Sequence, residues 1–288
     1  MTAGDPQAAA LRGIALAIAA GASFALLDSI AKHLTMRYPT PMVAWGRYFF
    51  HVALMLIVFW PRYRGSLIST RHPGLQVLRG LCLGMSSITF FSALALMPQA
   101  EATAIIAIAP VLGAMLAVAW LRETPPRGTW WALAVSFAGV LLIVRPGSSV
   151  FGPVALLPLA AAVFGGGYAV LTRRLAGIDH GTSTLFIGGL VATLLLCALV
   201  PFYWRTPESL VDLALLVCTG AVGAGGHLML VRAYERASAT TLAPYGYSHT
   251  VAALPLAYLV FGTFPHGLAL AGMLLIVGSG VAMAISRR

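Results

Sequence analysis

The most polar stretch in the apolar part of the chain covers residues 240–250, with the sequence TTLAPYGYSHT. Pro244 removes a backbone donor and Gly246 relaxes a helix, so the pair predicts a local break that exposes backbone polar groups. Regular helical spacing places four side chains on one face, namely Tyr245, Ser248, His249 and Ala252. Hydroxyls and an imidazole bind small solutes through hydrogen bonds. We expect this stretch to contact a solute, the alternative being a helix–helix interface of Tyr and Ser hydrogen bonds.

Hydroxyl and aromatic residues at a similar depth on other apolar runs could complete a pocket opposite this stretch. These candidate substrate-binding residues are Ser23, Phe24, Ser86, Ser87, Phe90, Phe164 and Tyr168, with His227 lying deeper toward the cytoplasmic side. Aromatic walls with a few hydroxyls and a neutral imidazole suit small amphipathic solutes, amino acids among them. The sequence offers no ring of fixed carboxylates, which disfavours a dedicated inorganic cation channel.

Two oppositely charged residues, Asp28 and Arg47, fall inside apolar runs. A charge in hydrocarbon costs at least about 2.5–3.5 kcal/mol at the centre of a helix, so each of them needs a partner. Because the loop 33–41 is short, we expect the two helices to be neighbours and the residues to form a structural ion pair in the outer leaflet. The alternatives are that Arg47 snorkels to the interface, or that Lys32, one turn from Asp28, takes the carboxylate. His51, one turn deeper than Arg47, is expected to pack rather than to bind.

No sequence motif points to covalent catalysis, a metal site or a cofactor. The three cysteines, Cys82, Cys197 and Cys218, lie in apolar runs without a CxxC pair, so we expect neither a disulfide nor metal binding. Asp28 is the single deep carboxylate, and the deep histidines fall on separate runs, whereas membrane-embedded enzymes usually cluster such groups. These observations favour solute binding over catalysis, and an enzyme acting on a lipid-linked substrate is the alternative function. A structural or chaperone-like protein without a solute path is a third possibility.

The composition determines the class of protein to which these residues belong. Of the 288 residues, 59% are hydrophobic and only 9% are charged, with a mean hydropathy of +0.89. A soluble domain carries roughly 25% charged residues, so the chain is expected to be a polytopic membrane protein. Its net charge of +10 is scattered singly or in pairs between apolar runs and does not indicate nucleic-acid binding.

Ten apolar runs are long enough to cross a bilayer, which takes roughly 20 residues. They cover residues 12–32, 42–60, 75–97, 101–121, 128–144, 152–172, 182–203, 211–234, 239–261 and 266–285. Short connections rich in proline and glycine separate them. The predicted fold class is an all-α polytopic protein with ten transmembrane helices, placed in a bacterial-type cytoplasmic (inner) membrane.

Basic residues in the short connections predict the orientation, because cytoplasmic loops are enriched in Lys and Arg. Thirteen fall on one side: Arg12, Arg62, Arg64, Arg71, Arg79, Arg122, Arg127, Arg173, Arg174, Arg232, Arg236, Arg287 and Arg288. Four fall on the other: Lys32, Arg37, Arg145 and Arg205. Both termini are therefore expected in the cytoplasm.

The chain contains an internal repeat with an offset of 140 residues, which superposes the first five runs on the last five. Matching landmarks include Pro61 with Pro201, and Gly80 with Gly220. The predicted halves are residues 1–144 and 145–288. Because each half holds an odd number of helices, the second enters the membrane upside down relative to the first. Inverted repeats of this kind place a solute site near the midplane and expose it alternately to each side.

Several short motifs resemble those of the EamA-type drug/metabolite transporter superfamily. They are Ala93-Leu94-Ala95-Leu96-Met97-Pro98 with its counterpart at 233–238, Pro110, Leu121-Arg122-Glu123, and Arg47. The resemblance implies a basket of ten helices in which helices 1, 3, 4, 6, 8 and 9 line a central cavity. It also implies an exporter of metabolites, including amino acids in the YddG-like branch. Thr250 stands at the position equivalent to Pro110, so these two sites are not a symmetric pair.

We therefore expect a secondary transporter that exports small metabolites, foremost amino acids including aromatic ones. The expected partners are the small-molecule substrate and the lipid bilayer, without a nucleotide-binding subunit. Proton coupling and facilitated diffusion are both compatible with the sequence, as are a monomer and a dimer.

Overall fold

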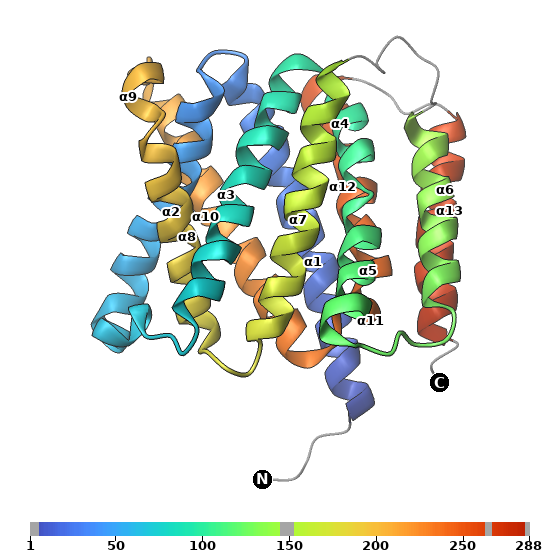
Figure 1. Ribbon diagram of the computed structural model, residues 1–288. Helices are drawn as coiled ribbons and strands as arrows, with labels where there is room; N and C mark the ends of the chain where they lie inside the picture. Colours follow the sequence, from blue (N-terminus) through green and yellow to red (C-terminus); the bar gives the residue numbers. More distant parts are fainter. Residues whose placement is uncertain (1–5, 145–152, 263–266, 286–288) are drawn as a thin grey trace.

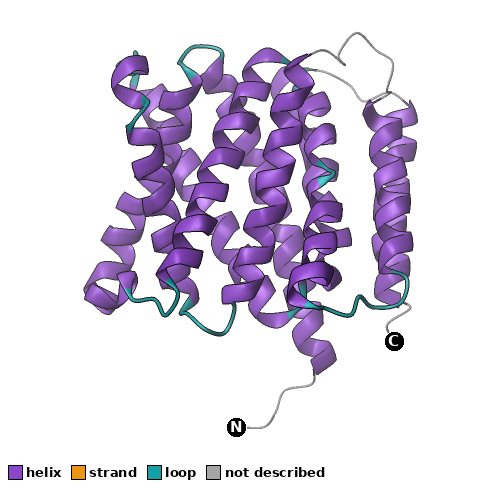
Figure 2. Ribbon diagram, viewed as in Figure 1, coloured by secondary structure: helices purple, strands orange, loops and turns teal. Residues whose placement is uncertain are grey.

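The described residues of the computed structural model, 6–144, 153–262 and 267–285, are almost entirely helical and contain no strand. A helix satisfies all its backbone hydrogen bonds within one segment, which hydrocarbon demands of any spanning element. The helices stand roughly parallel in one bundle (Figures 1 and 2). The predicted all-α polytopic fold is confirmed.

Each predicted run becomes one helix or two or three consecutive helical segments. The first half contains α1 (Pro6–Thr35), α2 (Thr40–Tyr63), η1 (Arg64–Ile68), α3 (Pro73–Leu96), α4 (Gln99–Ile106), α5 (Ala109–Leu121) and α6 (Thr129–Val144). The second half contains η2 (Pro153–Ala155), α7 (Leu156–Leu175), α8 (Gly181–Cys197), α9 (Val200–Tyr203), α10 (Leu210–Arg236), α11 (Ala239–Leu242), η3 (Ala243–Tyr247), α12 (Ser248–Phe261) and α13 (Gly267–Ile285). Within the described residues, 5 helices are individually long and apolar enough to cross a membrane, and the others are shorter.

Two of the predicted runs are interrupted within the bundle, at matching positions of the two halves. The break predicted at Pro244 and Gly246 is confirmed, because the 3₁₀ segment η3 separates α11 from α12 there. The break between α4 and α5 was not predicted. Pro110 lies in the first turn of α5, where its missing N–H costs no helical hydrogen bond. A Cβ on Gly246 would lie 3.0 Å from Pro110 Cγ, so the two breaks touch.

The two halves are intertwined rather than set side by side. Helix α1 packs mainly against α10 and α12, and its counterpart α7 packs against α3 and α5. In the same way α2 contacts α10 while α8 contacts α3, and α6 pairs with α13. These principal contacts join one half to the other. The boundary predicted at residues 144 and 145 lies at the edge of the described residues and stays a prediction.

Repeat-related glycines permit two of these contacts. A Cβ on Gly80 of α3 would lie 2.5 Å from Val191 Cβ of α8. A Cβ on Gly220 of α10 would lie 2.7 Å from the backbone nitrogen of His51 in α2. Real Cβ atoms do not approach so closely, so both helix pairs depend on the missing side chain.

Helix α1 begins and α13 ends at the same end of the bundle, as an even number of crossings requires (Figure 1). We call this the inner end and the opposite one the outer end, while the compartment that each faces stays a prediction. The charge count placed Arg79 among the basic residues that flank the apolar runs, and the structure corrects this. Arg79 lies inside α3 with 0% exposure, because the helix already begins at Pro73.

Candidate solute-binding site

A cavity of about 250 Å³ lies in the centre of the bundle, where the two halves meet. Its wall is formed by α1, α3, α4, α5, α7, α10, α11, η3 and α12, with Arg47 reaching in from α2. Apart from α2, which contributes Arg47, these helices correspond to the membrane-spanning runs 1, 3, 4, 6, 8 and 9 that the resemblance implied. The interrupted helices bring backbone to the wall, with Ala107 from one break and Ala243 and Gly246 from the other.

Most of the predicted pocket residues meet at this wall. Those that line it are Phe24, Ser86, Ser87, Phe90, Tyr168, His227 and His249, together with Asp28 and Arg47. The wall is thus aromatic with a few hydroxyls, as predicted. That these residues bind a solute stays a prediction.

Four predicted residues lie outside the wall: Ser23, Phe164, Tyr245 and Ser248. The prediction that Tyr245 and Ser248 share a face with His249 assumed a regular α-helix. The 3₁₀ segment η3 interrupts that regular spacing, and neither Tyr245 nor Ser248 lies in the wall that His249 lines. Ser23 donates to the Ala19 carbonyl of its own helix at 3.0 Å. In α7, Gly165 rather than Phe164 reaches the cavity.

Asp28 is bound by His249 and not by Arg47. Oδ2 of Asp28 lies 2.6 Å from Nε2 of His249, and the carboxylate residue is 3% exposed. The break at η3 starts α12 at Ser248, which puts His249 in its first turn facing α1. Gly21 permits this approach of α12 to α1, since a Cβ there would lie 2.9 Å from the backbone nitrogen of His249. The predicted Asp28–Arg47 ion pair was therefore wrong.

Arg47 points toward α3 and α10 instead. One terminal nitrogen donates to Ser87 Oγ at 2.7 Å, and the other lies 2.9 Å from His227 Nε2. The alternative pairing of Lys32 with Asp28 is also wrong. The Lys32 ammonium donates to the carbonyl oxygens of Leu94 and Met97, at 2.7 and 3.1 Å, and so caps the end of α3.

The hydrogen bonds of His227 fix its tautomer. A guanidinium only donates, so His227 Nε2 must accept from Arg47 and the imidazole must be neutral. Nδ1 then carries the hydrogen and donates to Tyr168 Oη, 3.0 Å away. Tyr168 Oη also accepts from Arg79 at 2.8 Å.

Arg79 extends this network toward the inner end. It donates to Thr172 Oγ1 and to the Thr184 carbonyl, each at 2.8 Å. Arg79 was missed as a core residue, although a signal was present, because the apolar run that contains it begins at residue 75. His51 is 0% exposed and does not line the cavity, in agreement with the prediction that it packs.

Further wall residues were missed by sequence reasoning. They include Gly21, Ile106, Ala107 and Tyr234. Glycine, alanine and isoleucine carry no chemical signal of their own. Pro110 was noticed through the family resemblance, but its place beside a helix break was not.

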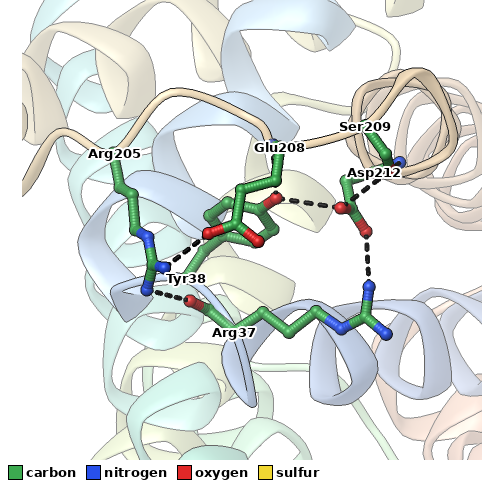
Figure 3. A network of polar contacts seen from close by, with 6 residues as sticks. All are labelled: Arg37, Tyr38, Arg205, Glu208, Ser209 and Asp212. Carbon is green, nitrogen blue, oxygen red and sulfur yellow. Dashed lines mark hydrogen bonds and ion pairs between the residues drawn. The ribbon is translucent and has the colours of Figure 1, made fainter.

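A polar cluster ties the halves together at the outer end (Figure 3). Asp212, at the start of α10, accepts from Tyr38 Oη at 2.9 Å and pairs with Arg37 at 3.3 Å. The backbone N–H of Glu208 donates to Tyr38 Oη at 2.8 Å. Arg205 donates to the Arg37 carbonyl at 3.1 Å. The loop between α1 and α2 is thus bound to the segment that enters α10.

Two clusters tie the halves together at the inner end. Glu123, after α5, pairs with Arg173 at 2.9 Å and accepts from the Thr240 N–H at the start of α11 at 3.1 Å. Asp179, between α7 and α8, accepts from the Arg71 N–H and from Thr70 and Gln76. Burial alone would raise the pKa of Asp179, but these hydrogen bonds outweigh it and lower the pKa below its ordinary value.

Similarity to known proteins extends over nearly the whole chain. A family model described as "EamA-like transporter family" matches residues 11–145 and 152–285. The pseudopaline exporter CntI of Pseudomonas aeruginosa is 28% identical over 280 residues, which covers 96% of this chain and 97% of that protein. The S-adenosylmethionine uptake transporter of Rickettsia conorii is 29% identical over 263 residues, with 91% and 88% covered.

Two further similarities are weaker in sequence. The riboflavin transporter of Vibrio cholerae is 24% identical over 271 residues, which covers 93% of this chain and 91% of that protein. A solved crystal structure shares the fold with a TM-score of 0.78 at 21% identity, covering 99% of this chain and 100% of that chain.

Proposed function

Because this chain belongs to the EamA-like transporter family, we propose that it is a secondary transporter that exports small metabolites, amino acids among them. The curated relatives are transporters and not enzymes, so the alternative of an enzyme acting on lipid-linked substrates is set aside. The chain is a multi-pass membrane transporter. The export direction, the amino-acid substrate and the YddG-like branch belong to the proposal.

The central cavity between intertwined halves is the observation that carries the proposal. Polar contacts between the halves occupy both ends of the bundle, at Arg37–Asp212 on the outer side and Glu123–Thr240 on the inner side. Alternating access would break and remake these two sets in turn, and so expose the cavity to one compartment at a time. The positive-inside count supports a cytoplasmic location for the inner end.

The relatives are named for different solutes, namely pseudopaline, S-adenosylmethionine and riboflavin. Family membership alone therefore leaves the substrate open. Amino acids are favoured here by the size of the cavity, about 250 Å³, and by its mixed wall of aromatic rings, hydroxyls and charged groups.

Counterflow into liposomes tests the proposal. Purified protein is reconstituted into liposomes, and each batch of liposomes is loaded with one unlabelled solute. The panel of solutes comprises the standard amino acids, S-adenosylmethionine and riboflavin. Uptake of the labelled form of the same solute is then followed with and without a pH gradient. We expect saturable uptake of at least one amino acid above protein-free liposomes. Absence of flux for every member of the panel would contradict the proposed function.

A further inference from the structure

A guanidinium without a carboxylate partner forms part of the cavity wall. Arg47 lines the cavity, is 5% exposed, and donates to the Ser87 hydroxyl and the His227 imidazole. Its Nε has no hydrogen-bond partner among the described residues, and none of the ion pairs found in that part of the chain includes it. A buried charge without a counter-charge is far more costly than a paired one.

The neighbours of Arg47 do not supply that counter-charge. Tyr48 donates its one hydroxyl hydrogen to the Leu83 carbonyl at 3.1 Å, so Ser87 must donate to Tyr48 while it accepts from Arg47. His227 is neutral because its Nε2 accepts from Arg47. Both hydrogen bonds from Arg47 therefore end on neutral groups, and among the described residues its guanidinium has aromatic neighbours, Tyr48 and Phe91, but no carboxylate partner.

A second charged position faces the same cavity. Asp28 lines it and is held by His249 through the 2.6 Å contact, apart from Arg47 and its partners. Aromatic side chains of Phe24, Phe90 and Tyr168 supply apolar wall. The cavity thus presents one cationic group, one anionic group and aromatic surface, which is the complement of a small zwitterion with an apolar side chain.

We infer that Arg47 and Ser87 form a subsite for the carboxylate of the transported solute, whose ammonium group is oriented toward Asp28. This inference rests on the proposed function and narrows its substrate class to zwitterions. A carboxylate at Arg47 would supply the counter-charge that the protein lacks there. Sequence reasoning assigned Arg47 a structural role only, because it paired the residue with Asp28.

Three probes that differ by one charged group test the subsite: L-phenylalanine, L-phenylalaninamide without the carboxylate, and 3-phenylpropanoate without the amine. Their binding to the full-length, detergent-purified protein is measured by calorimetry. We expect phenylalanine to bind at least about tenfold more tightly than the amide, and 3-phenylpropanoate also to bind more weakly than phenylalanine. This comparison on the wild-type protein decides the inference even if a variant fails to fold.

Variants assign the effect to Arg47. In Arg47→Gln, phenylalanine and phenylalaninamide should bind equally, whereas Arg47→Lys keeps the charge and should retain part of the preference. Arg71→Gln is the matched control. It removes one positive charge from the exposed inner end, where only the backbone N–H of Arg71 contacts Asp179, and it should keep the wild-type preference.

Three results would overturn the inference while leaving transport itself intact. One is binding of the amide within about twofold of phenylalanine in the wild-type protein. Another is a preference for the carboxylate that survives in Arg47→Gln. The third is absence of phenylalanine binding in a protein that moves other members of the liposome panel. Failure of all flux in that panel is instead a failure of the proposed function.

Discussion

Asp28 and His249 connect the two halves at the wall of the cavity. A carboxylate residue that is 3% exposed has lost most of its hydration, and the 2.6 Å contact with His249 replaces part of it. The partners sit on α1 and α12, which belong to different halves. Any relative shift of these helices must change this contact, so the pair links the charge of the site to the arrangement of the halves.

We expect Asp28→Asn and His249→Gln to be strongly coupled. Either single change leaves a buried polar partner behind, whereas the double change removes both. Thermal unfolding of the two single variants and the double variant should give a coupling free energy of about 1.5–3 kcal/mol, the range for hydrogen bonds to charged groups.

Ser23→Ala combined with His249→Gln is the matched control for this cycle. Ser23 lies on the same helix as Asp28 but bonds only to the Ala19 carbonyl. Its cycle should be additive within about 0.5 kcal/mol. Additive effects for the Asp28 and His249 variants as well would contradict the pairing.

At the scale of elements, close helix contacts and interrupted helices shape the cavity together. The breaks at α4–α5 and at η3 put backbone and short side chains at the wall, where regular helices would present longer ones. A glycine brings α1 close to the segment after the η3 break, because a Cβ on Gly21 would lie 2.9 Å from the backbone nitrogen of His249. Proline and glycine predicted one break from sequence. The other break was not predicted, because Pro110 fits the first turn of a helix and need not interrupt one.

Two glycines of α10 should respond differently to replacement by alanine. A Cβ on Gly220 would lie 2.6 Å from Phe50 Cβ, whereas one on Gly225 has no heavy atom within 4 Å. Gly220→Ala should therefore lower the free energy of unfolding by about 1–3 kcal/mol through overpacking. Gly225→Ala should leave it unchanged or raise it by up to about 0.5–1 kcal/mol, because alanine is the better helix former. Thermal denaturation in detergent measures both, and equal effects would rule out the close contact.

At the scale of the whole molecule, the interlocking of the halves explains which predictions hold. Length and apolarity identify the ten runs, because the bilayer imposes both on each spanning segment. The repeat offset identifies equivalent helices, and Gly80 and Gly220 do make equivalent contacts. None of these signals says which helix lies beside which. That information is non-local, since α1 packs mainly against α10 and α12 rather than α2.

The Asp28–Arg47 prediction failed for this reason. It assumed that a short loop makes α1 and α2 close neighbours, whereas Asp28 meets α12 and Arg47 meets α3 and α10. The residues that line the cavity were easier to predict than the hydrogen bonds and ion pairs that they form. Depth along each run follows from counting residues, but a partner in the other half depends on how the halves interlock.

Labelling of Ser86→Cys in a variant lacking the three native cysteines tests alternating access to the cavity most directly. Ser86 lines the cavity, and a thiol closely replaces its hydroxyl. A membrane-impermeant thiol reagent should react from outside intact cells and also from the cytoplasmic face of inverted vesicles. Ser23→Cys, on α1 outside the cavity wall, should react from neither side. Reaction of Ser86→Cys from one side only, or from neither, would contradict a cavity that opens to both compartments in turn.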